Sequence, residues 1–197
     1  MQDPTDNLSA TGRQLLHLMR DADTYAQLIV AGSGNTQARA ALEAVTAEDL
    51  VTGSFKVRDE TRGLLAGLWL WYDWLDRSHD ISQQIHTPTG SFWHAIMHRR
   101  EGDFSNSKYW YAKCASHPIL ASLGIQANSI LHPLPADKTL LKLTMNGWNA
   151  NAFVDLIEAV HDKPDDARYI AAVQLQRLEW KVLFDHGVRV AVAGNVL

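Results

Sequence analysis

The stretch DETRGLLAGLWLWYDWLDRSHDISQQIHTPTGSFWHAIMHRRE, residues 59–101, decides the fold that the sequence predicts. Its apolar residues follow helical spacing, and the part from Leu64 to Leu75 is apolar on nearly every side. A helix that is apolar all round is normally buried at the centre of a domain. We therefore predict one long central helix over about residues 59–85.

A second helix is expected directly after a short link. The Thr87 hydroxyl can accept a hydrogen bond from a free N–H at a helix start, and Pro88 suits the first helical position. The pattern continues to about Arg100, and Gly102 is a natural end signal. Because the link is only a few residues long, the two helices should be antiparallel neighbours.

Helical spacing also recurs in the rest of the chain. One helix should begin near Ser9 or Thr11, and further helices are expected over about residues 36–45, 105–114, 151–161 and 165–189. Only residues 140–145 and 188–192 are ambiguous between helix and strand. The predicted class is therefore all-α, a single-domain helical bundle over residues 1–197 with a long central helix paired to a His-bearing helix.

The stretch of residues 116–137 is rich in proline and is expected to be a long loop across the domain surface. The alternative, in which it separates two lobes, stays open at this stage. An N-terminus without a basic and apolar leader, and a longest apolar run (Gly63–Tyr72) of about half a membrane span, predict a cytoplasmic protein without membrane contact.

Composition excludes several other classes of protein. The chain has 197 residues, and its 46% of hydrophobic residues is typical of a globular protein. The single Cys excludes a disulfide framework. A net charge of −4, without a dense block of Lys and Arg, argues against nucleic acid as a partner.

Histidine and tryptophan are concentrated in one region. Residues 60–118 hold five of the seven Trp and five of the nine His. The Trp residues are most simply explained as core. His94, His98 and Glu101 have i, i+4, i+7 spacing, which places them within about 60° of one another on a helix.

A second polar stripe lies on the predicted long helix. Asp73, Asp76 and Asp80 recur at helical spacing, and His79 lies one turn from Asp76. In an antiparallel pair this stripe should lie at the level of His94, His98 and Glu101. Helix rotation, which the sequence does not fix, decides whether the two stripes face each other.

These stripes predict a His/carboxylate/Arg pocket that takes a small molecule. His94, His98 and Glu101 are the candidate catalytic residues and also the candidate ligands of a divalent metal, the one cofactor that the residues suggest. The candidate ligand-binding residues are Asp76, His79, Arg99, Arg100, Asn106, Lys108 and Tyr109. Glu101 or Asp76 would orient a histidine, and Arg99 or Arg100 would bind an anionic group.

One alternative remains beside this pocket hypothesis. The polar residues could form a ladder of Asp–His and Glu–Arg pairs that orders helix packing or faces water. In that case the chain would be a non-catalytic structural or interaction protein, with an aromatic-rich homo-oligomer interface.

Several motifs together resemble the signature of a family of uncharacterised bacterial and fungal proteins. They are TPTGSFWHAIMHRREGD at 87–103, NSKYWY at 106–111, His117-Pro118 and LEWKVLFDH at 178–186. The resemblance covers about residues 60–118 and 165–190. It implies no reaction or cofactor, and it marks the same region as the histidine cluster.

Overall fold

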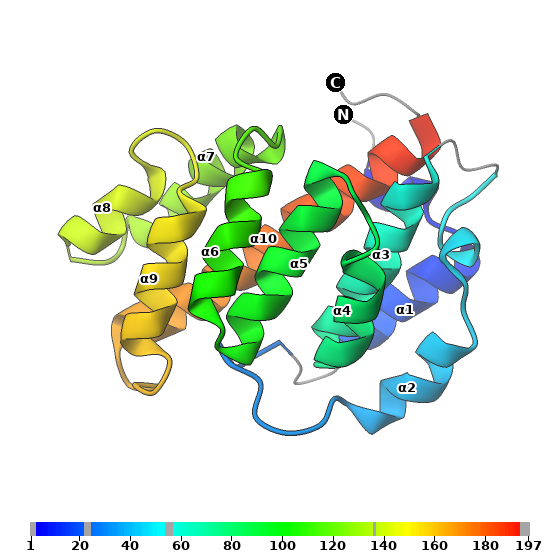
Figure 1. Cartoon of the computed structure of the whole chain (residues 1–197), viewed down its shortest axis with the longest axis horizontal. Coiled ribbons are helices and arrows are strands. Elements are labelled where there is room, and N and C mark those ends of the chain that lie inside the picture. Colours follow the sequence, from blue (N-terminus) through cyan, green and yellow to red (C-terminus); the bar gives the residue numbers. More distant parts are fainter. Residues whose placement is uncertain (1–2, 22–24, 54–56, 136, 194–197) are drawn as a thin grey trace.

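The helices of this protein surround a central one, α5, which lies between α6 on one side and α3 and α4 on the other (Figure 1). The computed structural model describes residues 3–21, 25–53, 57–135 and 137–193. Its α-helices are α1 (Ala10–Asp21), α2 (Thr36–Glu43), α3 (Arg58–Trp71), α4 (Leu75–Ser82), α5 (Pro88–Glu101), α6 (Phe104–Lys113), α7 (Ile119–Leu131), α8 (Lys138–Thr144), α9 (Ala150–Val160) and α10 (Ala167–Ala193). Two short 3₁₀ helices, Pro4–Asn7 and Ala47–Leu50, complete the order, and the described residues contain no β-strand. The all-α prediction is confirmed, and the chain forms a single helical domain.

The two ends of α5 follow the predicted signals. The Thr87 hydroxyl accepts a hydrogen bond from the Gly90 N–H, and Pro88 occupies the first helical position. At the other end Gly102 is left-handed, with φ of 90°, and its N–H closes the last turn. Local sequence alone therefore sets the length of the helix that carries His94 and His98.

The long C-terminal helix α10 crosses behind α5 and packs against α3, α7 and α9 (Figure 1). The core between them is rich in aromatic side chains. Trp93 and Trp180 lie at its centre with ring centroids 6.0 Å apart, and Trp180 stacks on Phe184 at 4.6 Å. All seven Trp residues lie in this core or pack against it, as the sequence predicted.

The predicted long helix over residues 59–85 is wrong as a continuous element. It breaks after Trp71, and α4 starts afresh at Leu75. Asp73 lies in the break with a left-handed backbone, φ of 64°. Left-handed backbone is uncommon outside glycine, although Asp is among the residues that tolerate it best. Local periodicity did not reveal the break because the apolar pattern continues through it.

The predicted surface loop over residues 116–137 is also wrong, because most of it forms α7. Pro118 stands immediately before that helix, a position that tolerates proline because the first N–H groups of a helix have no internal partner. Both ambiguous stretches are helical: residues 140–144 belong to α8 and residues 188–192 to α10. No helix within the described ranges is both long and apolar enough to cross a membrane.

Candidate metal centre

Three histidines from two helices meet between α4 and α5. His79 comes from α4, and His94 and His98 come from successive turns of α5. One ring nitrogen from each can be chosen so that all three atoms lie within 4.8 Å of one another. We call these residues the histidine triad. Tetrahedral Zn–N bonds of about 2.0–2.1 Å place ligand nitrogens about 3.4 Å apart, so the rings would have to turn and move closer to bind one ion together.

The triad rings pack in a defined way. His94 and His98 stack with centroids 4.6 Å apart, and His79 meets the edge of both rings, at 4.7 Å from His94 and 5.5 Å from His98. On α6, Trp110 stacks against His94 at 4.1 Å. The indole therefore walls the triad on the side of α6.

His94 is the most unusual member of the triad. It is only 3% exposed, and neither of its ring nitrogens has a hydrogen-bond partner among the described residues. Burial, followed by the nearby His98 and His79, lowers the pKa of His94 to about 3. The ring is therefore neutral at neutral pH and holds an unused lone pair. A buried polar group without a partner is costly and calls for an explanation.

His98 has polar neighbours that orient its ring. Its Nδ1 lies 3.2 Å from Glu101 Oε1, and the side-chain nitrogen of Asn106 lies 3.1 Å from its Nε2. A carboxylate only accepts hydrogen bonds, so Nδ1 carries the proton and donates it. This leaves the lone pair on Nε2, the tautomer that a carboxylate partner typically fixes in a metal-binding histidine.

Glu101 thus contacts a triad histidine, although it also belongs to a second close group. His98, Glu101 and Asp103 can likewise bring one ligand atom each within 4.8 Å. Asp103, however, already caps α6 by accepting a hydrogen bond from the Asn106 N–H at 3.0 Å. The histidine triad is the more buried of the two groups.

The two arginines predicted to bind a ligand are wholly buried and engaged by carboxylates of this chain. Arg99 Nη2 lies 2.6 Å from Glu179 Oε2 on α10, and Arg100 Nη1 lies 2.8 Å from Asp73 Oδ1. The Arg99 guanidinium also lies over the Phe153 ring, with 4.6 Å to its centroid. These contacts account for both arginines, and a role in binding an anionic ligand stays a prediction.

The remaining predicted ligand-binding residues lie at the surface, apart from the triad. Lys108 pairs with Asp155 of α9 at 2.5 Å, Tyr109 is 57% exposed, and Asp76 is exposed on α4. Of the predicted set, His79 and Asn106 are therefore the residues that the fold brings to His94 and His98.

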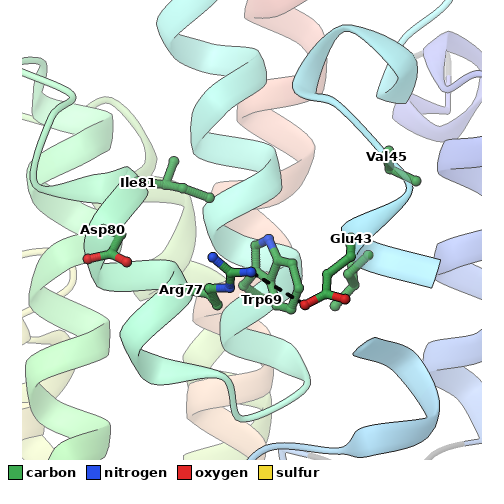
Figure 2. Close-up of a pocket in the computed structure, with 7 residues that line it drawn as sticks. Glu43, Val45, Trp69, Arg77, Asp80 and Ile81 are labelled. Carbon is green, nitrogen blue, oxygen red and sulfur yellow. Dashed lines mark hydrogen bonds and ion pairs between the residues drawn. The ribbon is translucent and has the colours of Figure 1, made fainter. Parts of the chain in front are cut away.

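The outer face of α4 lines a separate cavity of about 400 Å³ beside α2 and α3 (Figure 2). There Arg77 reaches across Trp69 to Glu43, with Nη2 and Oε1 3.4 Å apart. Asp80 lines this cavity too. The predicted aspartate stripe therefore does not face the histidines as a unit: Asp73 reaches Arg100, and Asp80 belongs to the far side of α4.

Sequence reasoning missed a second buried polar cluster near the start of α5. Thr89 Oγ1 lies 3.1 Å from His117 Nε2, and the His117 and His186 rings are 4.9 Å apart. Burial raises the pKa of Glu60, and the nearby Thr89 hydroxyl opposes that shift. These residues come from four separate segments, so spacing offered no signal for them. Trp110 was not expected beside the histidines either. Its position four residues after Asn106 on the same helix was the available signal, because that spacing places the two side chains on one face.

Comparisons with known proteins add no assignment. No protein-family model, no curated protein and no solved structure matches this chain. The resemblance to a family of bacterial and fungal proteins stays a prediction, and function is argued from the geometry of the site.

Proposed function

We propose that this protein binds one divalent transition-metal ion, Zn²⁺ in the first instance, through His79, His94 and His98. The observation that carries the proposal is the buried His94 ring: its nitrogens have no hydrogen-bond partner among the described residues, although two further imidazoles lie within reach. Coordination would give that ring the partner it lacks. Imidazole ligands suit Zn²⁺, Cu²⁺, Fe²⁺ and Ni²⁺, so the ligand type fits this class of ion.

The surroundings of the triad support the same proposal. Glu101 holds His98 through Nδ1 and leaves Nε2 for the ion. It thus acts as the orienting carboxylate and not as a ligand of this ion. The Asn106 amide nitrogen lies 3.1 Å from His98 Nε2 and would have to move aside for an ion to bind there.

The proposed ion would leave room for chemistry. Three protein ligands with an open fourth position are typical of catalytic zinc sites, in which a metal-bound water or a small molecule completes the coordination. We therefore propose a metal-dependent small-molecule-binding protein or enzyme. His79 is less buried than the other two ligands, so the open position would face its side of the triad.

The alternative of an aromatic homo-oligomer interface has less support. Among the exposed large hydrophobic residues of the described chain, Tyr109 is the one aromatic. The others lie scattered over separate parts of the chain: Leu18, Ile125, Leu141, Met145 and Ile170. Single exposed hydrophobic residues are ordinary at a protein surface.

Metal analysis of the purified protein tests the proposal. After saturation with Zn²⁺ and removal of loosely bound ion, we expect about one equivalent per chain. His94→Ala and His98→Ala should each lower the bound Zn²⁺ well below one equivalent per chain. His17→Ala and His132→Ala, which change exposed histidines, should leave the zinc content unchanged. Glu101→Gln should keep the stoichiometry but weaken binding about 10–100-fold. Equal metal content in His94→Ala and the unsubstituted protein would overturn the proposal.

A further inference from the structure

The turn between α3 and α4 is held by a charge contact from α5. Asp73 has a left-handed backbone, φ of 64°, and its carboxylate lies 2.8 Å from the buried guanidinium of Arg100. A non-glycine residue in this conformation costs about 1 kcal/mol or more, which the surrounding structure must offset. The contact with Arg100 is an offset that only the folded chain supplies.

Arg100 also completes the end of α3. Its Nη1 donates a hydrogen bond to the Leu70 carbonyl at 2.8 Å, and its Nη2 donates to the Gln27 carbonyl at 3.3 Å. The Leu70 carbonyl also accepts the Asp73 N–H at 3.1 Å, and the Trp69 carbonyl accepts the Trp74 N–H at 3.0 Å. Backbone hydrogen bonds thus close the last turn of α3, and Arg100 adds a side-chain donor to it. Its guanidinium further lies 4.0 Å from the centroid of the Tyr25 ring. One fully buried side chain therefore contacts both the last turn of α3 and the carboxylate of Asp73.

The break determines where His79 can go. In an unbroken helix each residue adds about 1.5 Å, which would carry His79 about 12 Å past Trp71 along the α3 axis. Instead α4 takes a new direction and packs on α5. That packing brings the His79 ring to 4.7 Å from His94 and 5.5 Å from His98. Of the three triad residues, only His79 depends on this break, because the other two share α5.

We propose that Asp73 and Arg100 are positioning residues of the metal centre: their contact holds the helix break that brings His79 to His94 and His98. This inference rests on the proposed function for the metal and extends it to two residues that do not touch the ion. Asp73 acts through His79 alone. Its substitution should therefore remove the contribution of His79 to metal affinity and leave the contributions of His94 and His98.

The test is a double-mutant cycle on Co²⁺ affinity, measured by competition with a chelator. Asp73→Ala removes the carboxylate and disfavours the left-handed backbone, and we expect it to weaken binding about tenfold or more, the size typical of residues behind a metal ligand. Asp73→Asn introduces a residue type that tolerates the left-handed backbone, so it should weaken Co²⁺ binding less than Asp73→Ala does. Asp76→Asn, an exposed change in the first turn of α4 that follows the break, is the matched control and should leave affinity unchanged.

The cycle separates positioning from general destabilisation. If Asp73 acts through His79, His79→Ala should weaken binding in the unsubstituted protein and have almost no further effect on Asp73→Ala. A merely structural role would leave the effect of His79→Ala the same in both backgrounds. Equal effects of His79→Ala in the two backgrounds would overturn the inference. So would an Asp73→Ala protein that binds Co²⁺ as tightly as Asp76→Asn does.

A measurement on the protein without metal tests the positioning of His79 independently of the proposed metal binding. The ring protons of His79 and His94 should give a nuclear Overhauser effect in the unsubstituted protein, and this signal should disappear in Asp73→Ala. If the unsubstituted protein binds no metal, the proposed function fails while this arm still decides whether Asp73 places His79. Persistence of the signal in Asp73→Ala overturns the positioning.

Discussion

Arg99 and Glu179 form an ion pair inside the protein, with Nη2 and Oε2 2.6 Å apart and both side chains fully buried. The Tyr111 hydroxyl and the Trp148 indole donate further hydrogen bonds to Glu179 Oε1, at 3.1 and 3.2 Å. This network joins α5 to α6 and α10 directly behind the turn that carries His98. It anchors the helix that supplies two of the three triad residues.

Removing the charge of Glu179 should destabilise the fold strongly. Glu179→Gln leaves the buried Arg99 guanidinium without its counter-charge, and breaking a buried pair from one side costs about 3–5 kcal/mol. Urea unfolding should show a loss of this size in the free energy of unfolding. The pair of Lys181 and Asp185 on the same helix is the control: Lys181 is mostly exposed, and Lys181→Ala should cost about 1 kcal/mol or less. Equal losses for the two variants would contradict the prediction.

The protein should lose stability between about pH 6.5 and pH 3, in part through His117. Burial, followed by the nearby His186, lowers the pKa of His117 to about 3. The unfolded chain, with a histidine pKa of about 6.5, binds a proton in this window that the folded protein does not. The free energy of unfolding therefore falls as the pH drops, by at most about 1.4 kcal/mol per pH unit for this group.

A substitution isolates this contribution from that of other groups. His117→Gln should flatten the slope of unfolding free energy against pH within the window, and the exposed His17→Gln should not. The Ile119 N–H donates to His117 Nδ1 at 3.4 Å, which places the proton on Nε2 facing Thr89. The Gln side chain can replace that donor. Unchanged slopes in His117→Gln would show that its burial does not control the titration.

Gly67 should resist the addition of a single methyl group. A Cβ there would lie 2.7 Å from the buried Trp93 ring, closer than packed atoms come. Overpacking of this kind costs about 1–3 kcal/mol and should exceed the helix propensity gained, about 1 kcal/mol. The midpoint temperature of thermal unfolding should be lower for Gly67→Ala than for the unsubstituted protein. Gly63→Ala, where the same ring is 3.2 Å away, should be the milder change.

Metal binding should be visible through Trp110. Its ring stacks on His94 with centroids 4.1 Å apart, so an open-shell ion such as Cu²⁺ at the triad would quench its fluorescence at close range. We expect saturating Cu²⁺ to dim part of the emission, and Trp110→Phe to remove most of that change. Quenching of the same extent in Trp110→Phe would place the ion elsewhere.

Local sequence predicted much of the fold because the signals concerned are short-range. Thr87, Pro88 and Gly102 set the ends of α5, and the i, i+4 spacing of His94 and His98 places both on one face. The apolar stripes of α9 and α10 likewise gave their approximate positions. A residue's own backbone preference and its neighbours three or four positions away are sufficient for such elements.

The sequence thus determined by itself an all-α chain in which two histidines of one helix stand beside a polar neighbouring helix. Tertiary structure alone decided that the third imidazole is that of His79. Asp73, with its left-handed backbone in the break, pairs with Arg100, 27 positions away along the chain, and a contact over that separation exists only once α5 packs against the end of α3. Tertiary structure also decided that Arg99 pairs with Glu179, since helix rotation follows from packing the whole core.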